Sequence, residues 1–145
     1  MEVKMSKLDL FRDHLNEREY RYREAADDAG KKRGPFIAQH EIKGDKLVTV
    51  IFEFSQDEAF VDLSIFDIAK IEDASKREKL LELINERNMS YRFGKFFVSD
   101  DGNIVMRWSL FIKDHFDPAF LLDMAFMLVG NVEEEYPKFM KLQWD

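Results

Sequence analysis

Cysteine is absent from this chain of 145 residues, so disulfides and thiolate metal sites are excluded. That absence fits a reducing compartment. Long apolar runs are absent too, since none approaches the roughly 18 residues that cross a bilayer. The segment from Met1 to Leu10 alternates charged and apolar residues and lacks the apolar core of a secretory signal. We therefore predict a cytoplasmic protein with no membrane partner.

A surplus of positive charge is also lacking. The chain holds 22 Lys and Arg against 29 Asp and Glu, for a formal net charge of −7. Because acidic proteins repel phosphate backbones, no nucleic-acid partner is expected. The one basic cluster, residues 31–33, lies in a polar stretch over 25–34 that we interpret as a solvated loop, with a phosphate-binding loop as the alternative.

Motifs that carry catalysis or hold cofactors are missing as well. The chain has no Gly-rich phosphate loop, and its serines show no nucleophile-elbow pattern. His14, His40 and His115 are isolated in the sequence, and the run from Asp100 to Asn103 lacks the ligand spacing of a calcium loop. We therefore predict no catalytic residue, no cofactor and no metal site, and expect that the protein is not an enzyme.

Aromatic residues, by contrast, are plentiful, with 14 Phe, 4 Tyr and 2 Trp. A chain of this length buries about 68–70% of its unfolded surface, which is enough for a core without covalent staples. No linker or repeat divides the sequence. We therefore predict a single domain over residues 1–145.

Hydrophobic periodicity predicts an α+β domain with the element order α-β-β-β-α-β-β-α. Ser6 is the expected N-cap of the first helix, and Ser75 opens a capping box for the second. Its apolar residues Leu80, Leu81, Leu83 and Ile84 are expected to face the sheet. Helices are expected over 7–16, 75–88 and 119–129, and strands over 36–42, 46–54, 59–66, 91–98 and 104–112. Residues 18–24 either add a short edge strand or continue the first helix.

Two asparagines, three residues apart, end the second helix. Asn88 is expected to close the helix, because Asn tolerates the left-handed conformation, while Asn85 bonds the neighbouring strand or loop. A role for the two amides in holding a ligand is the alternative. Further on, Gly102 stands in a turn where a positive φ is expected.

The segment Leu83-Ile84-Asn85-Glu86-Arg87-Asn88, with the following Tyr91-Arg92-Phe93-Gly94-Lys95-Phe96, resembles the YbjN family, whose fold is similar to that of type III secretion chaperones. The resemblance continues through Asp101-Gly102 to Leu110 and includes Tyr136-Pro137, while Ile84 stands where Leu is commoner. It implies a twisted antiparallel sheet of about five strands with helices packed against it. Asn85, Asn88, Gly94 and Gly102 would be structural residues, and no catalytic residue is implied. Family members are often described as sensory transduction regulators, and chaperones of similar fold dimerise and hold extended client segments.

Two functions fit this sequence. The first is a non-enzymatic protein-binding module, chaperone-like or regulatory, that holds a protein or peptide client in an apolar groove or at a sheet edge. The alternative is a small-ligand sensor with a pocket between helix and sheet, lined by Phe93, Trp108 and neighbouring aromatic residues. For these aromatic side chains, ordinary core packing is the competing interpretation.

The segment 119–129 is apolar nearly all round, with Asp123 as its one polar residue. A surface helix normally shows a single apolar stripe, and an uncovered apolar patch marks an interface. We therefore predict a homodimer, although a monomer in which the first helix and the sheet enclose this segment is the alternative. The predicted interface consists of Phe120, Met124, Phe126, Met127 and Leu128.

Overall fold

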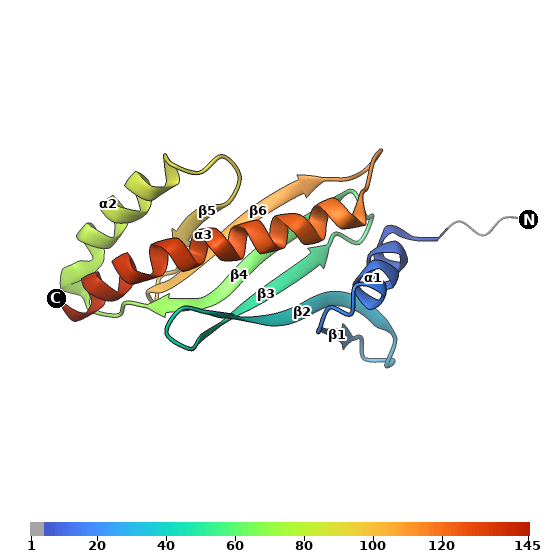
Figure 1. Ribbon diagram of the computed structural model, residues 1–145, viewed down its shortest axis with the longest axis horizontal. Helices are drawn as coiled ribbons and strands as arrows, with labels where there is room; N and C mark the ends of the chain where they lie inside the picture. Colours follow the sequence, from blue (N-terminus) through green and yellow to red (C-terminus); the bar gives the residue numbers. More distant parts are fainter. Residues whose placement is uncertain (1–4) are drawn as a thin grey trace, which may run out of the picture.

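The computed structural model describes residues 5–145 and consists of three α-helices and one antiparallel sheet (Figure 1). The helices are α1 (Lys7–Glu17), α2 (Arg77–Asn88), which follows the 3-10 turn η1 (Ala74–Lys76), and α3 (Pro118–Trp144). The strands are β1 (Arg23–Ala26), β2 (Lys32–Ile42), β3 (Lys46–Phe54), β4 (Phe60–Lys70), β5 (Lys95–Val98) and β6 (Asn103–Phe111). The predicted α+β class is confirmed, with six strands instead of about five. The additional strand is β1, so the end of the segment 18–24 is an edge strand. The segment from Met1 to Leu10, which lacks the features of a secretory signal, is described only from residue 5 onward.

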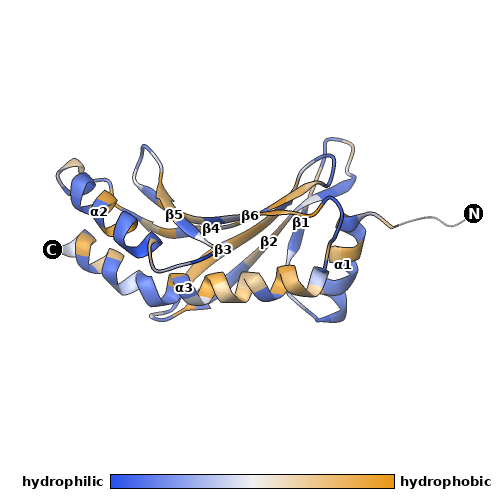
Figure 2. Cartoon of the chain, turned by 90° about the horizontal axis from the view of Figure 1, so that it is seen from above, coloured by the Kyte–Doolittle hydropathy of each residue, from blue (hydrophilic) through white to orange (hydrophobic). Residues whose placement is uncertain are grey.

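The strand order in the sheet is β1-β2-β3-β4-β6-β5, and every neighbouring pair is antiparallel. Helix α3 lies along one face of the sheet, with α1 near one end of it and α2 near the other (Figure 2). Among the described residues, no helix covers the opposite face. None of the helices in residues 5–145 is long and apolar enough to cross a membrane.

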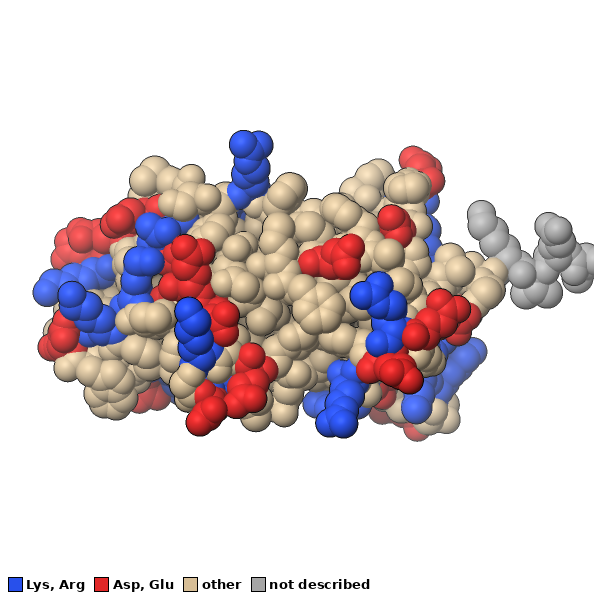
Figure 3. Space-filling model, in the orientation of Figure 1, with Lys and Arg blue, Asp and Glu red and all other residues tan. Residues whose placement is uncertain are grey.

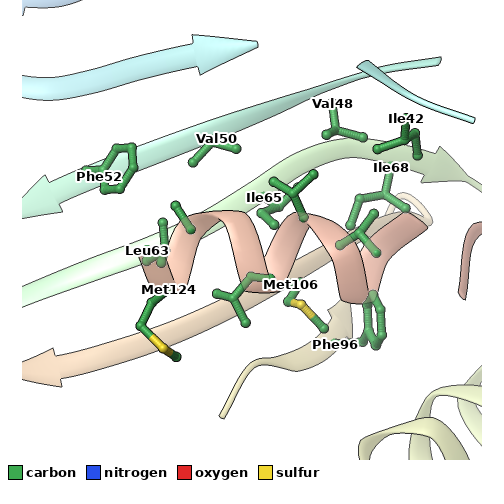
Figure 4. Packing of buried hydrophobic residues seen from close by; sticks show 14 of the residues in the cluster. Ile42, Val48, Val50, Phe52, Leu63, Ile65, Ile68, Phe96, Met106 and Met124 are labelled. Atoms are coloured by element: carbon green, nitrogen blue, oxygen red, sulfur yellow. The ribbon is translucent and has the colours of Figure 1, made fainter. Parts of the chain in front are cut away.

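The core lies between α3 and the sheet. Alternate residues of a strand point to the same face, and the face that meets α3 carries the buried apolar side chains. Val48, Val50 and Leu63 are fully buried on the α3 side, whereas Leu47, on the other face, is 50% exposed. Figure 4 shows these side chains converging with Met106 of β6 on α3. One face of the sheet therefore supplies most of the apolar burial that stabilises the fold.

The start of α2 differs from the predicted capping box. Asp73, not Ser75, supplies the cap: its Oδ1 accepts hydrogen bonds from the backbone N–H of Ser75 at 2.9 Å and from Ser75 Oγ at 2.7 Å. This bond organises η1, and α2 then begins at Arg77 without a side-chain cap. The expected orientation of Leu81 is also wrong, since it is 47% exposed. Leu80 and Ile84 are buried and Leu83 packs partly buried against the core, whereas the residue after Leu80 is rotated away from this stripe.

Two loop boundaries were also predicted wrongly. Lys32 and Arg33 belong to β2 and not to a solvated loop. The side chain of Asp27 accepts the N–H of Lys31 and closes the turn between the strands, so that β1 pairs with β2 as far as Lys32. Strand β5 begins only at Lys95 rather than near residue 91. The chain before it bends toward α3, where Gly94 is buried.

Helix α3 is longer than the apolar segment that predicted it. It begins after Asp117, whose Oδ1 accepts the N–H of Ala119 at 3.0 Å, and it continues through Pro137 to Trp144. Its first half packs against the sheet, and its second half lies beside α2 (Figure 1).

Candidate functional site

Strand β6 extends beyond its outer neighbour. Strand β5 pairs with residues 104–107 of β6, whereas β4 pairs with β6 as far as Phe111. In the described part of the chain, no strand therefore lies against the outer side of residues 108–111, and Figure 1 shows this half of β6 along the border of the sheet. Such an edge can accept a further strand.

The register identifies which backbone groups face outward. The N–H of Ile112 donates to the carbonyl of Ala59 at 2.8 Å, and this bond flanks the pair Phe60–Phe111. Phe111 is therefore in a non-hydrogen-bonded pair with β4, and its own N–H and C=O point away from that strand. Because the pattern alternates, the same holds for Ser109. Both residues are exposed, Phe111 by 56%.

A cluster of aromatic side chains lies beside this edge, on the side that faces α3. Trp108 contacts Phe93 with ring centroids 5.6 Å apart and Phe120 with centroids 6.1 Å apart. Phe93 and Phe120 are 44% and 43% exposed. We call Phe93, Trp108, Leu110 and Phe120 the edge cluster.

The edge cluster borders a pocket of about 480 Å³ where β6 turns into α3. The pocket, which we call the end pocket, is lined by Leu110, Phe111, Asp114, His115, Asp117 and Phe120. An open edge, apolar side chains and carboxylates thus meet at one end of the molecule.

The other edge of the sheet is partly occupied. Strand β1 covers the first half of β2. On the α3 side of the second half, Tyr20 Oη lies 2.5 Å from Nε2 of His40. The ring of Phe126 packs against both side chains. Burial raises the pKa of Tyr20 and lowers that of His40, so both groups are neutral near pH 7.

The space between α3 and the sheet is filled. Leu63, Met106 and Leu128 have no exposed surface there, and Figure 4 shows the packed side chains. Phe93 and Trp108, which the sensor hypothesis placed in a pocket between helix and sheet, instead contact each other beside the open edge of β6.

The two asparagines have different roles from those predicted. The side chain of Asn88, not Asn85, bonds the neighbouring strand: Oδ1 accepts the N–H of Phe96 at 2.8 Å, and Nδ2 donates to the Phe96 carbonyl at 3.1 Å. Asn88 thus acts as a strand partner for β5. The residue that follows it, Met89, has a right-handed φ of −68°, so no left-handed residue closes the helix. Asn85 is exposed and makes no side-chain hydrogen bond to the described residues.

Gly94 and Gly102 both lie where a side chain would collide with a neighbour. A Cβ on Gly94 would lie 2.6 Å from Cδ2 of Leu128, so glycine lets β5 approach α3. Gly102 has a φ of +90°, and its Cβ would lie 2.2 Å from the carbonyl oxygen of Ile71. At both positions the close approach of a neighbour favours glycine.

Glu135, Arg87, Lys138 and Tyr91 form a charged cluster that the sequence did not predict. The side chain of Glu135 in α3 has no exposed surface; its Oε1 accepts hydrogen bonds from Tyr91 Oη at 2.6 Å and Arg87 Nη2 at 2.9 Å. Its Oε2 lies 2.7 Å from Arg87 Nε and 3.1 Å from Lys138 Nζ. Burial alone would raise the pKa of Glu135, but the bonds from Tyr91, Arg87 and Lys138 lower it on balance. The available signal was spacing, since Glu135 stands seven residues after Leu128 and four before Phe139 on the buried stripe.

The residues proposed for the dimer interface divide into two groups. Met124 and Leu128 lie in the core with 6% and 0% exposure, so in this conformation a partner cannot reach them. Phe120, Phe126 and Met127 are exposed by 43%, 48% and 37%. Figure 3 shows a largely uncharged surface across the middle of this face, with charged groups gathered toward both ends. Phe126 and Met127 remain the proposed contact with a second copy, because Phe120 lines the end pocket.

We predict that a lysine in place of Met127 lowers the mass of the protein in solution, because a charge would have to be buried in the proposed two-fold contact. Light scattering at tens of micromolar should give a dimer mass for the unchanged protein and a monomer or an aggregate for Met127→Lys. Leu81→Lys on α2 is the matched control and should keep the dimer mass. A monomer mass for the unchanged protein would contradict the prediction.

Both the sequence and the fold are similar to those of known proteins. The model of the YbjN family, described as "Putative bacterial sensory transduction regulator", matches residues 7–129. Among solved structures, "Crystal structure of YbjN, a putative transcription regulator from E. coli" is similar with a TM-score of 0.67 at 15% identity, and the match covers 93% of this chain and 96% of that one. At this identity the likeness shows the fold. No curated protein matches the chain. Because the family model matches most of the sequence, the chain belongs to the YbjN family.

Proposed function

We propose that the chain is a single-domain, non-enzymatic binding module of the cytoplasm, chaperone-like or regulatory, that takes up an extended segment of another protein at the edge of β6. The observation that carries this proposal is the outward direction of the backbone N–H and C=O groups of Ser109 and Phe111. An added strand would satisfy these groups, as in other cases of strand addition. The description of the family as a regulator supports a binding role at a coarse level.

The edge cluster offers a place for the side chains of the added strand. Successive residues of a strand point to opposite faces, so residues opposite Trp108 and Leu110 would point toward α3. There they would meet the exposed rings of Phe93 and Phe120. The backbone edge would give affinity for any extended segment, and the edge cluster would select large apolar side chains.

A proline at position 109 tests strand addition. Because the Ser109 N–H points outward, Ser109→Pro keeps the bonds between β6 and β4 but removes the outward donor, and proline is tolerated at such edges. We expect peptides selected for binding from a random library to lose about tenfold or more in affinity for Ser109→Pro, because the N–H bond is lost and the ring obstructs the incoming strand.

Ser109→Ala is the matched control. It removes the 2.5 Å hydrogen bond from Ser109 Oγ to Asp62 but keeps the backbone donor, so peptide affinity should stay unchanged. Circular dichroism should show both variants folded. If the selection yields no peptide whose affinity distinguishes the two variants, the proposal is wrong.

The small-ligand sensor is a second candidate, favoured by the end pocket, whose volume of about 480 Å³ falls in the range of ligand sites. A small molecule would bind there without using the Ser109 N–H. Its affinity should therefore be the same for Ser109→Pro and Ser109→Ala, which distinguishes a sensor from a strand-binding module.

A further inference from the structure

We infer that the end pocket receives an arginine side chain from the bound segment, so that the module selects extended segments that combine arginine with a large apolar residue. This inference rests on the proposed strand addition at β6. It names the chemistry of the partner, which the edge itself does not determine.

The walls of the end pocket are apolar. Phe111 and Phe120 are 56% and 43% exposed, and Leu110, the residue before Phe111 in β6, is partly buried. A guanidinium stacks on aromatic rings, and the three methylene groups of arginine cover apolar surface. The walls therefore suit a long side chain with a flat, charged end.

The acceptors of the pocket are carboxylates. Asp117 is held in place because its Oδ1 caps α3, accepting the N–H groups of Ala119 at 3.0 Å and Phe120 at 3.4 Å. Asp114 is exposed at the mouth of the pocket. The lining contains no Lys or Arg, and the chain as a whole carries a net charge of −7. Charge complementarity thus favours a basic occupant, and arginine forms two-pronged bonds with carboxylates more readily than lysine does.

The register of the sheet fixes the spacing in the bound segment. A residue opposite Leu110 would point toward the end pocket, and a residue opposite Trp108 would lie over the aromatic ring, two positions away. The recognised pattern is therefore arginine and a large apolar residue separated by one residue. In an antiparallel segment the arginine comes first, and in a parallel segment it comes second.

Defined peptides test this pattern. The probes are Ac-Ser-Thr-Arg-Thr-Trp-Thr-Ser-NH2, its counterpart with Trp before Arg, and both sequences with citrulline, the neutral isostere, in place of arginine. Fluorescence anisotropy should show one arginine order binding about tenfold more tightly than its citrulline form, as expected for charged hydrogen bonds. Asp114→Asn should remove this preference, whereas Asp28→Asn, an exposed site that changes the net charge equally, should keep it.

The outcomes separate the two proposals. If arginine and citrulline peptides bind equally, and Ser109→Pro weakens both, strand addition stands and the arginine pocket is wrong. If the preference for arginine persists in Asp114→Asn, the assigned pocket is wrong. If neither order binds, and library selection also yields no peptide that depends on the Ser109 N–H, both proposals fail.

Discussion

Replacing Gly102 by alanine is expected to lower the free energy of unfolding by about 3 kcal/mol or more, through strain and steric overlap together. The φ of +90° is a conformation that L-residues rarely adopt, and the new Cβ would lie 2.2 Å from the Ile71 oxygen. The atoms that the Cβ would meet, in Ile71 and Glu72, all belong to the backbone. The N–H of Ile71 also donates to the Gly102 carbonyl at 2.9 Å, which holds the two segments together. The clash therefore cannot be relieved by a side-chain rotation, and it should loosen the β5–β6 turn from the end of β4.

Gly30→Ala provides the control for Gly102→Ala. Gly30 has a similar φ of +80°, but nothing lies within 4 Å of its would-be Cβ. Urea unfolding followed by circular dichroism should show a loss of about 1 kcal/mol for Gly30→Ala, the cost of backbone strain alone. Equal losses for the two variants would contradict the steric argument.

Removing the carboxylate of Glu135 should destabilise the fold by about 2–3 kcal/mol, because charged hydrogen bonds are lost while Arg87, which is 21% exposed, regains part of its hydration. In Glu135→Ala the guanidinium of Arg87 and the hydroxyl of Tyr91 would lose their shared acceptor. The loop after α2 would then detach from α3 more easily. Glu134→Ala is the matched control, since the neighbouring carboxylate is exposed and its loss should change little.

The same cluster predicts a dependence on pH with a definite sign. The pKa of Glu135 is lowered in the folded state from an ordinary value of 4.5. The cluster therefore stabilises the fold fully above that value, and the contribution is lost as the pH falls through the folded pKa. Urea unfolding between about pH 5 and pH 2 should show a shallower loss of stability for Glu135→Gln than for the unchanged protein. Parallel profiles would show that Glu135 does not carry this dependence.

Elements with a strong alternation could be predicted from sequence. Strand β6 was expected over 104–112 and lies at Asn103–Phe111, and β3 was placed correctly over 46–54. The alternation of apolar and polar side chains is a local property, so it predicts a strand without information about the neighbouring strands. The strand predicted over 91–98 is longer than β5, which begins at Lys95. Its start depends on how closely Gly94 approaches Leu128, and only the packing of α3 determines that distance.

The candidate site was less accessible to sequence analysis. Its central feature is the half of β6 that β5 leaves uncovered, and this depends on the length of another strand. The sequence singles out Phe93 and Trp108, but for a pocket between helix and sheet and not for a position beside the open edge of β6. Met124 and Leu128 were assigned to a dimer surface because an all-apolar helix gives no indication of which face meets the sheet.

The position of α3 in the chain has a consequence for synthesis on the ribosome. The strands β1 to β4 leave the exit tunnel well before residues 118–144, which cover their apolar face. Until α3 emerges, Val50 and Leu63, which are fully buried in the complete fold, stay exposed to solvent or to chaperones bound to the nascent chain. Folding should therefore conclude in a single late step, when α3 emerges and docks.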